Sequence, residues 1–242
     1  MYNYNEFDKM KILGICTSNN SCSVAISNHS NVLAANCNVE PAMQAQYLVC
    51  MIKKTMMQAK VTFEDIDYLA VTQGPGSFTG IRVGLAAALG IITVSKIVPI
   101  VISDFEVLKF LIKQQIKGVN IAFTIINAYR NKVYLQKFDF NSSSSFQAVL
   151  IDATEAVNLI LNTKSLSGCA GNATKMIYEL LVTTTTTIPN NIFFLPRFAY
   201  YDARPVCRLA YQLLASKQSY STELCPLYIC NRDFKHWKLE YR

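Results

Sequence analysis

The chain has 242 residues, of which 51% are hydrophobic and 16% are charged. This is enough apolar material to bury a core in one large domain or two smaller ones, and the shortage of charge predicts a surface that is partly neutral or covered by a partner. The net charge of +7 would suit a site near nucleic acid, but without a dense Lys/Arg block it equally fits a generally basic soluble protein.

We expect no secretory signal, because residues 1–9 are polar. We expect them to form a disordered extension, which would be absent if Met10 is the initiator. The most apolar stretch, residues 83–102, is interrupted by Lys96 and Pro99, so we expect no membrane-spanning helix. We expect a cytoplasmic location.

Cysteine and histidine usage predicts neither disulfides nor a metal site. The eight cysteines include no Cys-x-x-Cys pair and mostly lie in apolar runs, which favours buried free thiols in a reducing compartment. The two histidines, His29 and His236, are far apart in the sequence, which argues against a zinc or di-histidine site.

The first half of the chain predicts three strands, then alternating helices and strands. A meander of short strands is followed by a helix that opens at Pro41, and another helix begins at about Ile81. The expected strands span residues 12–15, 22–27, 32–37, 68–72 and 97–102, and a further helix spans 105–115.

The second half repeats the strand–turn–strand opening. Cys16 and Asn127 hold equivalent places, each at the end of the first strand of its hairpin, which suggests two related halves. Thr183–Thr187 is β-branched and predicts extended chain or loop, and Asp202 is a candidate helix cap. Strands are expected at 120–126, 133–140 and 166–170, and helices at 152–161, 173–181 and 203–216.

These elements predict an α/β fold with mixed sheets flanked by helices. Two halves of this kind resemble the two-lobed actin-like (ASKHA) architecture, a duplicated RNase H-like fold. We expect a first lobe over residues 10–104 and a second over 105–242, with the C-terminal helix and tail packing back on the first.

The glycine-rich segment from Gly74 to Gly80 joins the strand 68–72 to a helix. Helix N-termini favour anions, and glycines let the backbone approach a phosphate. Residues Gly74, Gly76, Ser77, Thr79 and Gly80 are therefore a candidate phosphate or nucleotide loop. The Lys-Ser/Thr pair of a P-loop is absent, so a tight turn in which Ser77 caps the helix is the alternative.

The same segment, followed by Ile81-Arg82-Val83-Gly84-Leu85, closely resembles the hallmark of the TsaB (YeaZ) family. Weaker similarities hold in order and spacing from about Met10 to about Arg232. They are the opening strand Ile12-Leu13-Gly14-Ile15, the hairpins at Cys22-Ser23-Val24-Ala25 and Asn127-Ala128, the turn Gly171-Asn172-Ala173 and the segment Pro226-Leu227-Tyr228-Ile229.

The resemblance implies a two-lobed actin-like protein that pairs with the catalytic subunit TsaD and the ATPase TsaE. This machinery transfers threonylcarbamoyl to N6 of the adenosine beside a tRNA anticodon, so tRNA is an indirect partner. The chain itself would supply no catalytic residue, need no cofactor and hold no metal. Weak nucleotide binding and a homodimer in the absence of a partner are left open.

Departures from related phosphotransferases agree with a non-catalytic role. Cys16 and Asn127 stand where many relatives carry an Asp that holds Mg²⁺ or a water, and neither a thiol nor an amide can replace it. The rival hypotheses are a stand-alone nucleotide hydrolase or glycopeptidase-like enzyme, and a purely homodimeric scaffold.

Two surfaces are candidate contact sites. The resemblance implies a subunit interface on the helices of the first lobe, at Met43, Tyr47, Met51, Leu85 and Ala88, with ordinary core packing as the alternative. The basic and aromatic tail residues Arg232, Lys235, Trp237 and Lys238 could contact tRNA or the partner, or form a solvated end.

Overall fold

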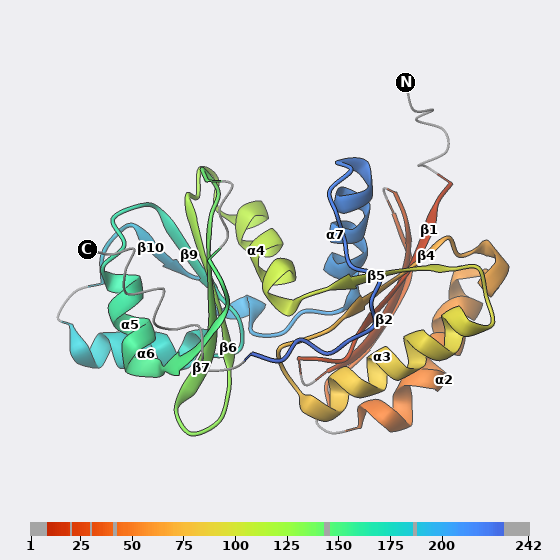
Figure 1. Cartoon of the computed structure of the whole chain (residues 1–242), viewed down its shortest axis with the longest axis horizontal. Coiled ribbons are helices and arrows are strands. Elements are labelled where there is room, and N and C mark those ends of the chain that lie inside the picture. The colour runs from red at the N-terminus through yellow and green to blue at the C-terminus, as the bar shows by residue number, and fades with distance from the viewer. Residues whose placement is uncertain are drawn as a thin grey trace. The chain divides into compact units, whose positions relative to one another are not determined.

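The computed structural model describes residues 9–19, 21–29, 31–40, 43–142, 146–185 and 188–229. The chain forms two compact units (Figure 1). Unit 1 comprises the described residues up to Val107 together with Tyr201–Leu227, and unit 2 comprises Leu108–Tyr200 with the described residues that follow Leu227. The sequence placed the boundary after residue 104, whereas the division falls inside helix α4 (Asp104–Gln115). Residues 201–227, part of the C-terminal segment that was expected to pack back on the first lobe, belong to unit 1.

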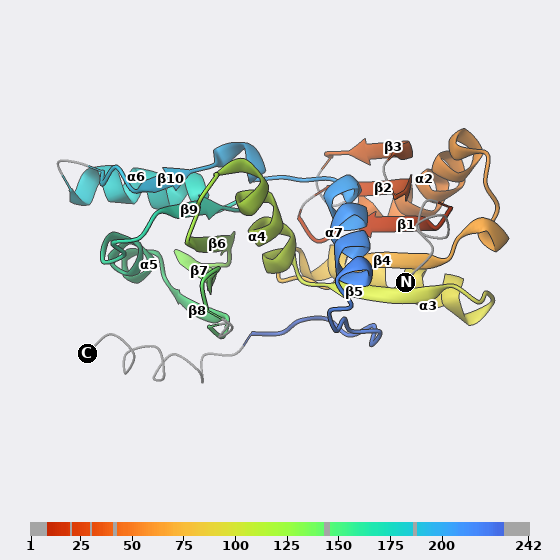
Figure 2. The ribbon, with the colours of Figure 1, turned by 90° about the horizontal axis from the view of Figure 1, so that it is seen from above.

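Unit 1 is built on a five-stranded mixed sheet, sheet A, in the order β3-β2-β1-β4-β5 (Figure 2). The central strand β1 is antiparallel to β2 and parallel to β4, with Gly14 opposite Ala25 and Ala70. The strands are β1 (Lys11–Cys16), β2 (Cys22–Asn28), β3 (Val32–Asn38), β4 (Tyr68–Thr72) and β5 (Val98–Ile102).

Helices cover both faces of sheet A. Helices α2 (Gln44–Ala59) and α3 (Phe78–Thr93) pack on one face, where Leu48 and Leu85 join the core. Helix α7 (Ala203–Ala215) covers the other face. It approaches β1 so closely that a Cβ added at Gly14 would lie 2.5 Å from Cys207 Sγ. Glycine on β1 therefore permits this contact between a strand and a helix nearly the whole chain apart.

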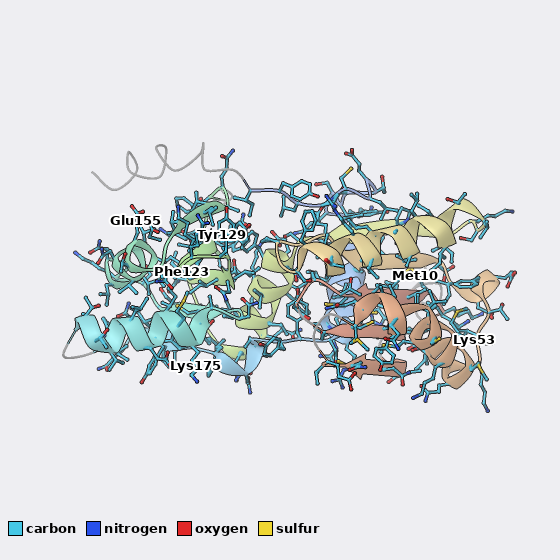
Figure 3. The ribbon with its side chains drawn as sticks, turned by 90° about the horizontal axis from the view of Figure 1, so that it is seen from below. Met10, Lys53, Phe123, Tyr129, Glu155 and Lys175 are labelled. Atoms are coloured by element: carbon cyan, nitrogen blue, oxygen red, sulfur yellow. The ribbon has the colours of Figure 1, made fainter. Side chains whose placement is uncertain are left out.

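Unit 2 repeats this plan. Its sheet B has the order β10-β9-β6-β7-β8, which matches sheet A when β6 is set equivalent to β1. Helices α5 and α6 pack on one face around Phe123, which lies among the side chains that fill the unit (Figure 3). The elements are β6 (Ile121–Asn127), β7 (Lys132–Asp139), β8 (Val149–Asp152), α5 (Ala153–Leu161), β9 (Ser167–Ala170), α6 (Thr174–Thr184) and β10 (Ile192–Phe194).

The other face of sheet B is covered by α4, whose Ile112 would meet a Cβ at Gly168 at 2.5 Å. Cys16 and Asn127 are the last residues of β1 and β6, as the repeat predicts. The duplicated α/β fold with mixed sheets is thus confirmed. No helix among the described residues is long and apolar enough to cross a bilayer.

The sequence misplaced some elements. Strands β8 and β10 were not predicted, because they are only four and three residues long and give too little alternation. Helix α3 begins at Phe78 rather than near Ile81, since Ser77 caps it. Thr183 and Thr184 are helical, at the end of α6, and their hydroxyls donate to the carbonyl of Leu180. Pro41 lies outside the described residues.

Candidate functional site

The glycine-rich segment forms a tight connection between β4 and α3. Gly74 has a positive φ of 97°, which favours glycine. Its amide donates to Asp104 Oδ2 at 3.0 Å, and the amide of Ser77 donates to the carbonyl of Ser18 at 2.6 Å. Ser77 Oγ accepts from the amide of Gly80 at 3.2 Å, so this hydroxyl caps α3.

The glycines of this segment pack against the turn between β1 and β2. A Cβ at Gly76 would lie 2.1 Å from the carbonyl oxygen of Ser18, and a Cβ at Gly80 would lie 2.0 Å from that of Thr17. At Gly84 it would lie 2.4 Å from Thr17 Oγ1. The face of small residues on α3 is therefore used for packing inside unit 1.

This geometry bears on the predicted phosphate loop. The amides of Gly74, Ser77 and Gly80 already have protein acceptors, and Gly76 and Gly80 face a backbone turn. Thr79 is exposed at the start of α3. The tight turn capped by Ser77, which was the alternative from sequence, is present, and nucleotide binding stays a prediction.

Asp104, which the sequence analysis missed, holds the segment in place. Its carboxylate is buried and accepts hydrogen bonds from the Gly74 amide, the Tyr201 hydroxyl and Ser18 Oγ, the last at 2.6 Å. The carbonyl of Tyr201 accepts from Asn19 Nδ2 at 2.6 Å. The one available signal was an acid placed two residues after an apolar strand.

Burial dominates the protonation of this cluster. It raises the pKa of Asp104 from 3.8 to about 6, although hydrogen bonds from Ser18, Tyr201 and Gly74 lower it. Burial, followed by the charge of Asp104, also raises the pKa of Tyr201 and of Cys16. The hydroxyl and the thiol therefore stay protonated at neutral pH.

We expect Asp104→Asn to remove a pH dependence of stability. Between pH 3.8 and about 6 the folded protein holds a proton that the unfolded chain releases. The free energy of unfolding of the wild type should therefore fall as pH rises, by up to about 1.4 kcal/mol per pH unit. Urea unfolding at pH 4, 5, 6 and 7 measures the difference between the two proteins. A wild-type advantage that grows with pH would contradict this prediction.

The surroundings of Cys16 differ from those of Asn127. These two residues stand where many relatives are expected to carry a metal-binding Asp. Cys16 is buried in unit 1, with Sγ 4.0 Å from the carbonyl of Tyr201. Asn127 lies at the exposed end of β6 in unit 2, where its backbone N–H donates to Asn172 Oδ1 at 2.6 Å. Within the described residues, no three His, Cys, Asp or Glu side chains gather as metal ligands would.

The predicted interface residues are placed unequally. Met43, Tyr47 and Met51 are half-buried at the start and middle of α2. Leu85 and Ala88 belong to the core of unit 1, so the prediction that they lie at a partner surface is revised. Their spacing marks the inner side of α3, where small residues let the helix approach the sheet.

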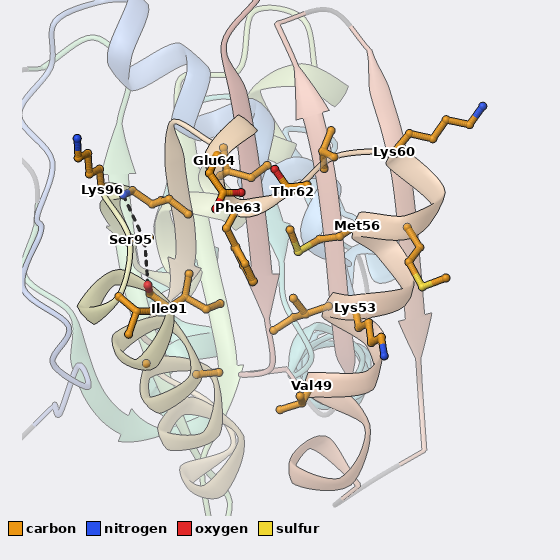
Figure 4. Close-up of a pocket in the computed structure, with 18 residues that line it drawn as sticks. Val49, Lys53, Met56, Lys60, Thr62, Phe63, Glu64, Ile91, Ser95 and Lys96 are labelled. Carbon is orange, nitrogen blue, oxygen red and sulfur yellow. Dashed lines mark hydrogen bonds between the residues drawn. The ribbon is translucent and has the colours of Figure 1, made fainter.

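An apolar groove, which none of these five residues lines, lies between α2, α3 and the short helix η1 (Phe63–Asp65) (Figure 4). Its volume is ≈ 1190 Å³. Phe63 points into the space between the two longer helices. Val49 and Met57, at 69% and 70% exposure, line it on α2.

Lysines surround this groove. Lys53 and Lys60 come from α2 and its C-cap, and Lys96 follows α3, with Glu64 as the acid among the lining residues. The groove thus combines an apolar floor with a basic rim. The tail residues Arg232, Lys235, Trp237 and Lys238, predicted to contact RNA or a partner, lie outside the described residues.

Comparison with known proteins gives the family. Residues 43–217 match the family model described as TsaD, tRNA N6-adenosine threonylcarbamoyltransferase. A relative from Buchnera aphidicola (strain Sg), named tRNA threonylcarbamoyladenosine biosynthesis protein TsaB, is 35% identical over 54% of this chain and 62% of its own length. The chain belongs to the TsaB (YeaZ) family, within the wider family of the TsaD model.

Other TsaB relatives extend the match. The protein of that name from Buchnera aphidicola (strain Bp) is 26% identical over 76% of this chain and 86% of its own length. The structure of YeaZ from Pseudomonas aeruginosa has a TM-score of 0.71 at 19% identity and covers 91% of this chain and 100% of that one. At this identity the YeaZ structure supports the fold alone. The first of the two Buchnera matches spans 62% of that relative's length.

Proposed function

We propose that this TsaB-family chain is a non-catalytic partner subunit in the formation of N6-threonylcarbamoyladenosine on tRNA. It would pair with a TsaD-type catalytic subunit and act with a TsaE-type ATPase in the cytoplasm. Family membership supports the pathway, because the curated relatives are named for it. The observation that carries the partner role is the apolar, lysine-rimmed groove on the outer side of α2 and α3.

Exposed apolar side chains gather around this groove. Val49, Met57 and Val94 line it, and Val94 is 86% exposed at the C-cap of α3. Contiguous apolar surface of this kind marks protein interfaces. A partner would therefore cover α2 and α3 from outside.

The positive charge of the groove's rim favours a different protein, rather than a second copy of this chain, as the partner. Lys53, Lys60 and Lys96 would meet the same lysines, or other basic side chains of α2 and α3, in a symmetric dimer. An acidic surface on the catalytic subunit would complement them. A homodimer in the absence of that subunit is the weaker association on this argument.

The cluster around Asp104 supports a chain without catalysis or a required cofactor. The glycine-rich segment is engaged with Ser18 and Asp104, and the buried thiol of Cys16 is a poor ligand for Mg²⁺. The role of this segment in the proposal is to hold α3 against sheet A, and so to shape the groove.

We expect Val49→Glu and Met57→Glu each to weaken pairing with the TsaD-type subunit by about tenfold or more, because each would place a carboxylate in the apolar floor, beside the lysines and opposite the proposed acidic partner surface. Both side chains are exposed, so the fold should persist. Co-purification and a titration of the two subunits measure the loss, and threonylcarbamoyl transfer to tRNA with the TsaE-type ATPase reports the function. Val182→Glu, on the exposed side of α6, is the matched control.

Other results would identify the rival functions. A wild-type chain that runs alone and turns over nucleotide or glycopeptide would be an enzyme, most directly if Ser77→Ala or Thr79→Ala abolishes turnover. A chain that only self-associates, with the same sensitivity to Met57→Glu, would be a homodimeric scaffold.

A further inference from the structure

The positive charge of the chain is unevenly distributed between the two units. Unit 1 contains ten basic and ten acidic residues, so it is neutral overall. The continuous part of unit 2, Leu108–Tyr200, contains nine basic and four acidic residues, an excess of five. Most of the net charge of +7 therefore lies in unit 2.

Much of this excess gathers at the end of sheet B where β6 and β9 begin and β7 ends. The amides of Asn120 and Ile121 donate to the carbonyl of Leu166 at 2.9 and 3.1 Å. The amide of Phe140 donates to the carbonyl of Asn120 at 2.8 Å. These bonds join the turn after α4, the loop before β9 and the end of β7 into one surface.

Exposed lysines come to this surface from the end of α4 with the turn after it and from the loop before β9, whereas Lys137 of β7 is buried. We call this surface the basic end of unit 2 and define it by residues 109–120, 137–142 and 162–167. Lys113, Lys117 and Lys164 are exposed there, and Lys109 is half-buried. Asp139 is the acidic residue in these three ranges of the sequence.

Phenylalanines hold two of these cations in place. Lys109 Nζ lies 4.6 Å from the ring centroid of Phe138, and Lys113 Nζ lies 5.3 Å from that of Phe140. Both lysines project from α4, which lies along one face of sheet B (Figure 1). A lysine that rests on an aromatic face keeps its charge and loses less side-chain freedom when it binds an anion.

The basic end differs from the groove of unit 1 in its chemistry. No large hydrophobic side chain among its described residues is exposed, and amides such as Gln114, Gln115 and Asn162 surround the lysines. Protein interfaces need apolar anchors at their centre, whereas a phosphate backbone needs spaced cations and hydrogen-bond donors. This surface therefore fits the phosphate backbone of a nucleic acid better than it fits a protein.

We propose that the basic end of unit 2 binds the phosphate backbone of the tRNA substrate directly. This inference rests on the proposed function, which brings tRNA to the complex, and adds the surface of this chain that would hold it. The contact would position the tRNA without reading its sequence, because lysine–phosphate contacts carry no base information.

Binding of unfractionated tRNA to the full chain, measured by fluorescence anisotropy over a range of KCl concentrations, tests the inference. The triple variant Lys113→Gln, Lys117→Gln, Lys164→Gln should weaken binding by about tenfold or more. The slope of log K against log salt should become shallower by about two to three, since each phosphate contact contributes about 0.7 to 0.9. The three side chains are exposed, so urea unfolding should match the wild type.

The matched control removes three exposed charges from unit 1 by Lys54→Gln, Arg208→Gln and Lys217→Gln. It should leave the affinity and the salt slope near the wild-type values. An equal loss in the control would mean diffuse attraction and would overturn the proposal, as would a wild type that fails to bind tRNA at about 0.1 M salt.

Pairing with the TsaD-type subunit separates this inference from the proposed function. The triple variant of unit 2 should pair normally while it loses tRNA affinity. If the wild type fails to pair, the proposed function falls. If pairing stands and the salt slope does not change in the triple variant, only the basic end is misassigned.

Discussion

Replacing Gly80 with alanine is expected to lower the free energy of unfolding by about 3 kcal/mol or more. The added Cβ would lie 2.0 Å from the carbonyl oxygen of Thr17, and a backbone atom cannot move aside as a side-chain tip can. Either α3 or the β1–β2 turn must shift, and both belong to the core of unit 1. Urea unfolding followed by circular dichroism measures the loss.

Gly90 provides the matched control on the same helix. Nothing lies within 4 Å of a Cβ built there, so Gly90→Ala should raise stability by about 0.5 to 1 kcal/mol through helix propensity alone. The two substitutions are chemically identical and should have opposite signs. Equal, small effects would mean that α3 does not approach the turn as closely as the structure indicates.

Replacing Asp104 with alanine is expected to cost about 3 kcal/mol, because it strands several buried donors at once. The Gly74 amide, the Tyr201 hydroxyl and the Ser18 hydroxyl all donate to this carboxylate. The fold should loosen first at the glycine-rich segment. Unfolding at pH 7, above the pKa of about 6 of Asp104, together with hydrogen exchange of the Gly74 amide, measures both effects.

Tyr201→Phe is the variant for comparison. It removes one hydrogen-bond donor and leaves the carboxylate of Asp104 with the donors from Gly74 and Ser18. It should cost about 1 kcal/mol. If Asp104→Ala were no more costly than Tyr201→Phe, the carboxylate would not be the centre of this cluster.

The sequence predicted the repeated plan of strands and helices because alternation and helical periodicity are properties of neighbouring residues. It also located the glycine-rich segment, whose composition is distinctive. It did not find Asp104, because the partners of this side chain come from residues 18, 74 and 201 and only the fold brings them together.

The interface prediction shows a second limit. The resemblance implied that Leu85 and Ala88 lie at a subunit interface, but the sequence could not say whether that side of α3 faces sheet A or a partner. The structure puts them in the core and leaves Val49 and Met57 of α2 outside. The basic end of unit 2 was beyond reach for the same reason, since the segments that carry Lys117 and Lys164 come together only when β6 and β9 pair.

The packing of α7 on β1 has a consequence for biosynthesis. Cys207 of α7 lies against Gly14 of β1. The face of sheet A that α7 covers therefore stays exposed until the ribosome has made nearly all of the chain. Leu108–Tyr200, by contrast, is continuous and is complete earlier. Because domains fold as their sequence emerges and distant contacts form slowly, the second half should reach its native state before the first. The N-terminal strands would meanwhile depend on chaperones to keep one apolar face from aggregating.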